Sequence, residues 1–458
     1  MDAKAWRNIL SHAKVGSVAS DLCGTIAALA RKMATEKWPD LAASTACRLI
    51  ALDKNPGCRP TGIGEVLRRI TGKAVMEAIK DDIRNAVGNL QVCAGQKAGC
   101  EAAIHAMKIF EEPDCDAVLM IDATNAFNNI NRKAILHNTK IKCPSFAMHI
   151  ENLYAQPAKQ FVSDRETGRL EIIESAEGTT QGDPVAMAMY AIGLLKLQDR
   201  ISHENTQVKQ VAYADDLTGA GKTENIKRWW DKVELYGPMQ GYYPNAQKTV
   251  LIIKIKTDGE KHLGAILGPV HEREKFIKDR VEEWVIEIRR LAKIATIEPH
   301  AAYTALTFGI RHRWNFLMRT VPGIAHLFEP LEKTLKRELL PALTGGRNPT
   351  DAERSIFELP PRKGGLGIPN PCKLAEIEHE NSIKLTAAQQ IIDQNEHGEI
   401  NLAEQKKKKK IKTEITRNRE QRQEEQLHSL MQQLPEDARK WEHQIGSPPC
   451  LYERRGSA

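Results

Sequence analysis

Val211–Leu217 reads V-A-Y-A-D-D-L and places two adjacent carboxylates, Asp215 and Asp216, at the end of a short apolar run. Earlier in the chain a second apolar run, Ala117–Ile121, ends at Asp122. Paired aspartates on a turn are usually solvated. These lie between apolar residues, however, and like charges close to a core are costly unless a cation compensates them. We therefore expect the two tips to meet in space and to hold divalent cations.

Length and composition set the outer bounds. With 458 residues the chain is too long for one ordinary core, so we expect two or three domains. No apolar run approaches the ~18 residues of a transmembrane helix, and residues 1–10 lack the apolar segment of a signal peptide. Nine cysteines without a C-x-x-C pair favour reduced thiols in the nucleus or cytoplasm and no structural zinc. The net charge of +7 fits a polyanionic partner but does not require one.

The first part of the chain predicts helices over residues 1–50 and then a turn at Pro56-Gly57. Lys54 and Arg59 flank this turn on a possible hairpin, with Gly62 and Gly64 as further turn residues. Taken alone, the pattern favours a surface hairpin with solvated charges. The alternative is a phosphate clamp, in which cationic side chains stand at the edge of flexible backbone.

The middle of the chain carries the polar loops. Ala117–Ile121 has the length and continuous apolar character of a strand covered on both faces, and it presents Asp122 at its end. A lone aspartate after a strand is most often a helix cap, so Asp122 alone proves little. Phe127 follows five residues later, and a polar loop at 178–183 precedes a helix that is apolar nearly all round. We expect that helix to be buried.

The second half changes character twice. Thr223–Gly237 predicts an amphipathic helix, and Gly241–Ile255 a turn and a strand with Lys248 at its start. From about residue 270 the apolar residues follow the 3.6-residue helical period and the polar faces are basic. From about residue 395 the composition is of low complexity and includes the lysine run Lys406–Lys410. Such a run is most often solvated or disordered, with nucleic-acid binding or nuclear import as alternatives.

Taken in order, these features resemble the reverse transcriptases, most closely those of non-LTR (LINE-like) retrotransposons. The Asp122…Phe127 block, the Gln181-Gly182 loop and the Y-A-D-D segment carry the resemblance, which runs from about Leu49 to Gly268 and loosely to Ile368. It implies an α+β right-hand polymerase fold, with a palm built on a small antiparallel sheet backed by helices and an α-helical thumb.

The resemblance also implies a division of the chain. The expected parts are a helical N-terminal extension (1–50), fingers (51–115), a palm (116–268) with part of the fingers inserted around 140–175, a helical thumb (269–345), a C-terminal connection (346–395) and a charged, Lys-rich, partly disordered tail (396–458).

The implied activity is RNA-directed DNA polymerisation, in which dNTPs are added to a primer 3′-hydroxyl on an RNA template. Two Mg²⁺ ions, with Mn²⁺ as a possible substitute, would stabilise the attacking and leaving oxygens. Asp122, Asp215 and Asp216 match the metal ligands, Asp216 in a supporting role. Lys248 matches the lysine that protonates the departing pyrophosphate, with a solvated strand-edge lysine as the alternative. The implied partners are RNA template, DNA primer and dNTPs, with no membrane; the sequence sets no oligomeric state.

The resemblance further implies a nucleotide site. Phe127 matches the aromatic gate that rejects a 2′-hydroxyl, against the alternative of a core phenylalanine. The residues assigned to nucleotide binding are Lys54, Arg59, Ala123 (through its carbonyl), Phe127, Gln181, Gly182 and Tyr213.

Two departures leave alternatives open. Asn128 stands where many relatives have an acidic residue. No endonuclease domain precedes residue 50, and no ribonuclease H domain or zinc knuckle follows residue 370, which predicts a fragment, a decayed copy or a standalone polymerase. The competing functions are a polymerase-fold protein that only binds nucleic acid and an RNA-directed RNA polymerase. The intact aspartates argue against the first of these, and Phe127 against the second.

Overall fold

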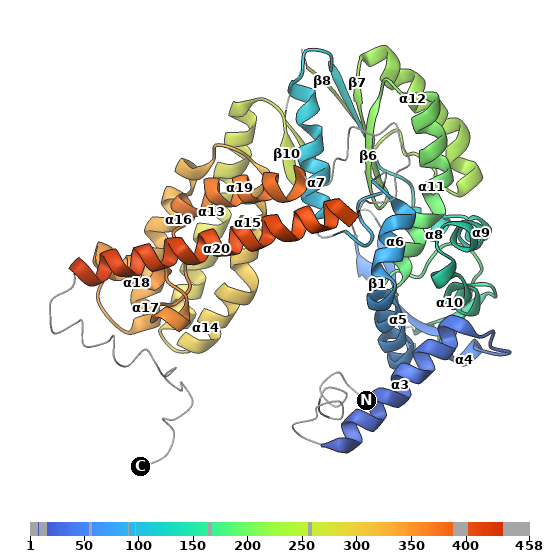
Figure 1. The fold of residues 1–458 in the computed structure, drawn as a ribbon, viewed down its shortest axis with the longest axis horizontal. Coiled ribbons are helices and arrows are strands. Elements are labelled where there is room, and N and C mark those ends of the chain that lie inside the picture. The colour runs from blue at the N-terminus through green and yellow to red at the C-terminus, as the bar shows by residue number, and fades with distance from the viewer. Residues whose placement is uncertain are drawn as a thin grey trace. The chain divides into compact units, whose positions relative to one another are not determined.

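The computed structural model describes residues 8, 16–54, 57–89, 91–96, 98–163, 167–254, 259–387 and 402–433. The chain divides into two compact units (Figure 1). The first comprises residues 1–256 with 390–401, and the second comprises residues 257–389 with 402–458. Each unit mixes helices with small, mainly antiparallel sheets, which confirms the α+β class expected from the sequence.

A four-stranded antiparallel sheet forms the centre of the first unit. Its order is β6-β7-β3-β8, with bounds Lys209–Tyr213, Asp216–Gly221, Ala117–Ile121 and Val250–Ile253. In the register, Ile121 pairs with Leu217 and Tyr213 pairs with Asp216. The end of β3 and the β6–β7 turn therefore lie at the same edge of the sheet. The sequence prediction that the two carboxylate-bearing tips meet is confirmed at the level of the backbone.

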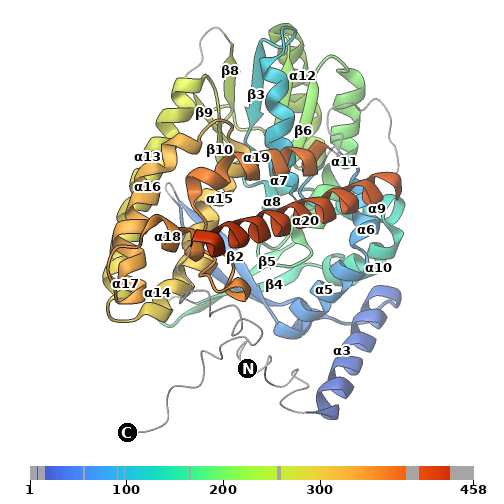
Figure 2. The same cartoon turned by 60° about the vertical axis from the view of Figure 1, so that its left-hand side comes forward.

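Helices α11 (Ala186–Glu204) and α12 (Thr223–Tyr236) lie beside this sheet (Figure 2). Helix α11 is buried along most of its length, as its apolar composition predicts. Trp229 of α12 is fully buried and stands against Gly219 of β7, where an added Cβ would be 3.0 Å from the indole ring. The absence of a side chain at Gly219 thus allows the helix to pack closely on the strand.

A second four-stranded sheet has the order β2-β1-β4-β5, with bounds Cys58–Gly64, Cys47–Asp53, Ala158–Ser163 and Leu170–Ser175. The β1–β2 hairpin is the one expected around Pro56-Gly57. The prediction that helix extends to residue 50 is wrong, because β1 begins at Cys47, and pairing with two neighbours overrides local propensity. Gly62 and Gly64 are strand residues and not turn residues.

The first unit contains further helices, some of which contact the two sheets. They are α3 (Ser17–Thr35), α4 (Ala42–Thr45), α5 (Val66–Ala78), α6 (Lys80–Val87), α7 (Gly99–Ala106), η1 (Met107–Glu111), α8 (Ala126–Asn129), α9 (Arg132–Lys142), α10 (Pro144–Tyr154) and η2 (Gly237–Gln240). Helix α5 starts after Glu65, whose side chain accepts a hydrogen bond from the Arg68 N–H.

The second unit is mainly helical. Its elements are β9 (Glu260–His262), β10 (Ala265–Leu267), α13 (Val270–Ala295), α14 (Pro299–Ala305), η3 (Leu306–Ile310), α15 (Arg311–Thr320), η4 (Ala325–Phe328), α16 (Glu329–Thr334), η5 (Leu335–Leu339), α17 (Leu340–Thr344), α18 (Asp351–Glu358), η6 (Pro361–Lys363), α19 (Pro371–Ala387) and α20 (Leu402–Gln433). The 3.6-residue period read from about residue 270 is borne out by α13, which buries Ile277, Val281, Trp284 and Ile288. None of the helices in the described ranges has the length and apolar character needed to cross a membrane.

Candidate active site

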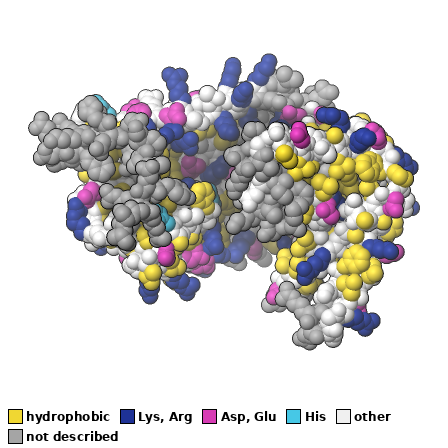
Figure 3. All heavy atoms as spheres, turned by 90° about the horizontal axis from the view of Figure 1, so that it is seen from below, with side chains coloured by type: hydrophobic (Ala, Val, Ile, Leu, Met, Phe, Trp, Pro, Cys, Tyr) yellow, Lys and Arg dark blue, Asp and Glu magenta, His cyan; other side chains and the backbone are white. Residues whose placement is uncertain are grey.

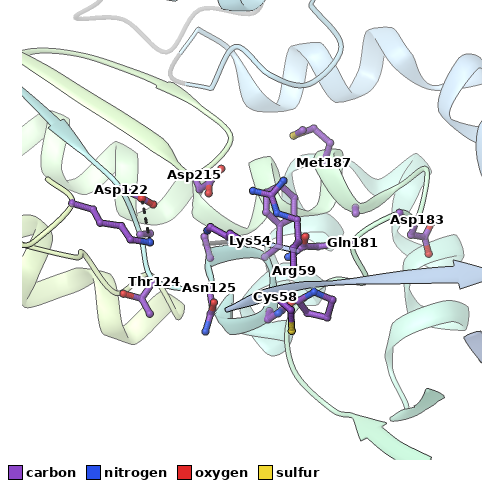
Figure 4. Close-up of a pocket in the computed structure, with 18 residues that line it drawn as sticks. Lys54, Cys58, Arg59, Asp122, Thr124, Asn125, Gln181, Asp183, Met187 and Asp215 are labelled. Carbon is purple, nitrogen blue, oxygen red and sulfur yellow. Dashed lines mark ion pairs between the residues drawn. The ribbon is translucent and has the colours of Figure 1, made fainter. Parts of the chain in front are cut away.

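A cavity of about 400 Å³ opens at the edge of the central sheet where the acidic tips meet (Figure 4). It is lined by the end of the β1–β2 hairpin, the segment after β3, the loop before α11 and the β6–β7 turn. The lining residues are Lys54, Cys58, Arg59, Pro60, Asp122, Ala123, Thr124, Asn125, Ala126, Phe127, Asn128, Gln181, Gly182, Asp183, Ala186, Met187, Asp215 and Lys248. The structure therefore brings together most of the residues singled out from the sequence. Asp216 and Tyr213 are not in the lining.

Asp122 is fixed by the strand it follows and by the loop after η2. Its carbonyl accepts a hydrogen bond from the Asn245 N–H at 2.9 Å, and the Thr124 N–H donates to the Tyr243 carbonyl at 2.9 Å. These backbone hydrogen bonds join the segment after β3 to residues 243–245, and Lys248 follows three residues later. Its Nζ lies 3.8 Å from Asp122 Oδ2. Both side chains are about half exposed, so the ion pair is weak and the lysine can turn toward a bound anion.

The β6–β7 turn is held by neutral hydrogen bonds. Ala214 has a φ of +56°, which is unusual for a residue with a side chain. The fully buried amide of Gln91 fixes this conformation: its Oε1 accepts from the Ala214 N–H at 2.8 Å and its Nε2 donates to the Ala214 carbonyl at 3.0 Å. The Tyr242 hydroxyl donates to the Asp215 carbonyl at 3.0 Å. Sequence reasoning missed both residues, since nothing local to them signals a contact with this turn.

The acidic groups perturb one another. Burial raises the pKa of Asp215, the charge of Asp122 raises it further, and Arg59 and Lys54 act in the opposite direction. Desolvation, followed by the charges of Asp215 and Asp122, raises the pKa of Asp216 to about 6. The three carboxylates thus share one region of negative potential, the condition under which a bound cation is most favourable.

The donor set fits a magnesium site that a substrate would complete. Across the described ranges, no three or more His, Cys, Asp or Glu side chains gather closely enough to enclose a metal ion. Asp122 and Asp215 supply carboxylates at the cavity, and the backbone of Ala123 also lines it. Mg²⁺ takes oxygen ligands, keeps several waters and commonly shares substrate phosphates, so two carboxylates and a carbonyl are sufficient. Asp216 begins β7 with its side chain exposed, outside the lining.

Phe127 also lines the cavity. Its ring stacks on that of Tyr190, with the ring centroids 4.5 Å apart and the planes 23° from parallel. Tyr190 is fully buried on α11, so the phenylalanine rests on a rigid support and still reaches the lining. The backing by Tyr190 was not anticipated from the sequence.

The loop before α11 is joined to the β1–β2 hairpin. The Gly62 N–H donates to the Gln181 carbonyl at 2.7 Å. Gly182 has a φ of +101°, and a Cβ there would be 2.6 Å from the Gly62 carbonyl oxygen. No other residue type fits that position without moving one of the two segments. The hairpin that carries Arg59 and the loop that carries Gln181 are therefore held in one arrangement.

A buried ion pair completes the join. Arg68 of α5 pairs with Asp183, and both side chains are almost wholly inaccessible to solvent. Arg68 also donates to the Thr45 carbonyl at 2.9 Å, and the Tyr154 hydroxyl donates to Asp183 at 2.8 Å. A buried charge pair of this kind is stable only when its remaining donors and acceptors are satisfied, as most are here. The sequence analysis quoted Asp183 in its loop but did not identify this role.

An antiparallel sheet with an aspartate after one strand, a second aspartate in the neighbouring hairpin turn and a cation-flanked cavity beside them defines the palm of a nucleic-acid polymerase. Residues 52–271 match the family model described as "Reverse transcriptase (RNA-dependent DNA polymerase)". This segment, just under half of the chain, is therefore a reverse transcriptase domain. The family prediction made from the sequence is thereby confirmed.

Individual relatives were found by sequence and by structure. The chain is 25% identical over 285 residues to the "Retrotransposable element SLACS 132 kDa protein" of Trypanosoma brucei gambiense, a match that covers 58% of this chain and 23% of the relative. Among solved structures, apo telomerase from Candida tropicalis, truncated from its C-terminal domain, matches with a TM-score of 0.40 and 13% identity over 55% of this chain and 59% of that one. Telomerase from Candida albicans in complex with a fragment of telomeric RNA matches with a TM-score of 0.44 and 10% identity over 82% and 66%.

Proposed function

We propose that the chain is an RNA-directed DNA polymerase of a retrotransposable element, which extends a primer 3′-hydroxyl with dNTPs on an RNA template. One observation carries the proposal: Asp122 and Asp215 line the same cavity as Phe127 and the cations Arg59 and Lys54. The family match over residues 52–271 and the retrotransposable-element relative support it.

The residues of the cavity have complementary roles in this reaction. Arg59 and Lys54 bind the triphosphate of the incoming nucleotide, and Gln181 and Gly182 position it. Phe127 excludes a 2′-hydroxyl by contact. When bound, two divalent cations, Mg²⁺ or in its place Mn²⁺, lower the barrier by stabilising the attacking and leaving oxygens.

The acidic residues and Lys248 complete the proposed mechanism. Asp122 and Asp215 would hold the cations together with the Ala123 carbonyl, and Asp216 would support them electrostatically from the edge of the site. Lys248, which lies within reach of Asp122, donates a proton to the departing pyrophosphate. Tyr213 acts only indirectly, since it lies outside the cavity lining.

We propose further that residues 51–115 act as fingers, 116–268 as palm and 269–345 as a thumb that grips the template–primer duplex by its backbone. The cysteines of the described ranges are free thiols, which supports a reducing compartment, either nucleus or cytoplasm.

Primer extension on poly(rA)/oligo(dT) with Mg²⁺ or Mn²⁺ tests the proposal. We expect extension with dTTP and not with UTP, and loss of extension in Asp215→Ala. Asp231→Ala, which removes an exposed carboxylate on α12, is the matched control and should retain activity. Incorporation of UTP in preference to dTTP would indicate an RNA polymerase. Binding of the duplex without extension in either metal would indicate a protein that only binds nucleic acid.

A further inference from the structure

Helix α20 of the second unit has its charges sorted along its length. Between residues 406 and 419 there are eight lysines and arginines and one glutamate, whereas residues 420–433 contain one arginine and three glutamates. A helix that is polar on all sides needs neighbours or external partners to hold it in place. The two ends of α20 meet this need differently.

The C-terminal half of α20 is attached to its own unit. Glu420 pairs with Arg362 at 3.3 Å, Glu424 pairs with Lys363, and the Gln426 amide donates to the Ser355 carbonyl at 2.9 Å. Leu430 is buried. These contacts hold the C-terminal half of the helix to its own unit. Figure 3 shows lysine and arginine side chains, in dark blue, at several places on the surface that it views.

The cations of the N-terminal half form a stripe. Four of them line one shallow groove along the helix, together with Thr413 and Glu414. The members of this α20 stripe are Lys406, Lys409, Lys410 and Arg417. All four are exposed, and none has an ion-pair partner in the part of the chain that the structure describes. From Lys406 to Arg417 the stripe extends roughly 16 Å along the helix axis, at a rise of about 1.5 Å per residue.

This arrangement opposes the stability of the helix itself. Lysines three and four residues apart repel each other, as Lys406 does with Lys409 and Lys410. A local pattern that opposes the structure it forms is expected where an external ligand compensates for it. The compensating ligand must be a polyanion.

The composition of the helix selects among polyanions. Leu402–Gln433 contains no Phe, Tyr or Trp, and the stripe has no ring at all, so it offers no platform for base stacking, the usual means of binding single strands. Point charges spaced along an axis instead suit the regular phosphates of a duplex, which are bound without reference to sequence. We propose that the α20 stripe is a second nucleic-acid surface, outside the polymerase cavity, that binds the phosphate backbone of double-stranded nucleic acid.

The test is the salt dependence of duplex binding by the full-length chain. The variant K406Q/K409Q/K410Q/R417Q removes four charges and keeps good helix formers. Fluorescence anisotropy with a blunt 20-base-pair RNA–DNA hybrid would be measured from about 50 to 200 mM salt, the range in which phosphate contacts are resolved. Each lost phosphate contact lowers the slope of log K against log salt by about 0.9, so the slope should fall by about 3 to 4.

Two controls keep the result specific. K73Q/K133Q/K142Q/K196Q makes the same change in net charge at exposed lysines of the first unit and should leave the slope close to that of the original chain. Replacing the three stripe lysines by arginine keeps the charge and should preserve the slope, which guards against a helix that has simply unfolded.

An unchanged slope in the stripe variant would overturn the proposal, as would an equal loss in both glutamine variants. So would loss of binding to vesicles of anionic phospholipid with duplex binding intact, because the surface would then be a membrane contact. The assay requires no catalysis and can be run in Asp215→Ala, so failure of the proposed polymerase activity would not affect it.

Discussion

Replacement of Gln91 by leucine should loosen the turn that carries Asp215. The amide of Gln91 satisfies both backbone groups of Ala214, and both residues are buried. An unpaired buried backbone group costs about 1–3 kcal/mol. The Cys93 thiol also contacts the Ala214 backbone, but sulfur is a weak partner. Leucine fills a similar volume, so the cost comes from the two unpaired backbone groups of Ala214. Together they should cost about 3 kcal/mol, which is roughly a hundredfold in the equilibrium between the closed and the open turn.

Amide hydrogen exchange followed by mass spectrometry measures this local opening directly. It is preferred to global unfolding, because a chain with two compact units does not have a single free energy of unfolding. We expect peptides covering residues 211–217 to exchange roughly a hundredfold faster in Gln91→Leu. Primer extension should fall as well, because the turn no longer holds Asp215 toward the cavity.

Gln210→Leu is the matched control. Gln210 is also a buried glutamine with two hydrogen bonds, accepting from Trp229 Nε1 at 2.8 Å and donating to the Gln198 carbonyl at 3.0 Å. It should destabilise the first unit by a similar amount but leave extension at a permissive temperature largely intact. If Gln91→Leu left exchange at 211–217 unchanged, or if both variants lost activity equally, the assignment of Gln91 as the residue that positions this turn would be wrong.

Three further perturbations probe the rest of the site. Gly182→Ala should raise the KM for dTTP, because the residue has a φ of +101° and its new Cβ would lie 2.6 Å from a carbonyl oxygen. Gly345→Ala is the control: Gly345 has a φ of +66° but lies in open space, so this change should lower stability by about 1–2 kcal/mol and leave the KM unchanged. Asp216→Asn should stabilise the metal-free protein at pH 7. Burial raises the pKa of Asp216 from the usual 3.8 of an aspartate to about 6, so the folded state loses stability as the pH rises between these two values. Solvent screening at this exposed position limits the gain in stability to about 1 kcal/mol. Thermal unfolding of both proteins would be measured at pH 4 and pH 7, and equal stability at pH 7 would contradict the prediction. Phe127→Ala should raise UTP incorporation relative to dTTP by at least about tenfold, and an unchanged ratio in single-nucleotide extension would remove Phe127 from the gate role.

The strand-and-turn pattern around the acidic residues could be read from the sequence because each part is local. An apolar run followed by Asp122, and a second run followed by the aspartate pair, fix which residues end strands. Antiparallel pairing then brings the ends to one edge of the sheet. The order of the motifs was sufficient to identify the family.

The supporting contacts could not be read because they join residues far apart in the chain. Gln91 and Ala214 are separated by 123 positions, and Arg68 and Asp183 by 115. A buried glutamine or arginine has no characteristic neighbours in sequence. The start of β1 was missed for a related reason, since its partners in β2 and β4 set its conformation.

The two supports differ in charge, and this difference bears on how the site works. The acidic turn is fixed by neutral groups, the amide of Gln91 and the hydroxyl of Tyr242, which do not reduce the negative potential around Asp215. A basic residue in either place would hold the turn as firmly but would lower the carboxylate pKa and compete with a cation. The charged support, Arg68 with Asp183, is instead placed under the nucleotide loop and is neutral as a pair. The fold thus keeps the negative potential around Asp215 available to a cation, and it places Lys54 and Arg59 in the same cavity, where the proposed function has them bind a triphosphate.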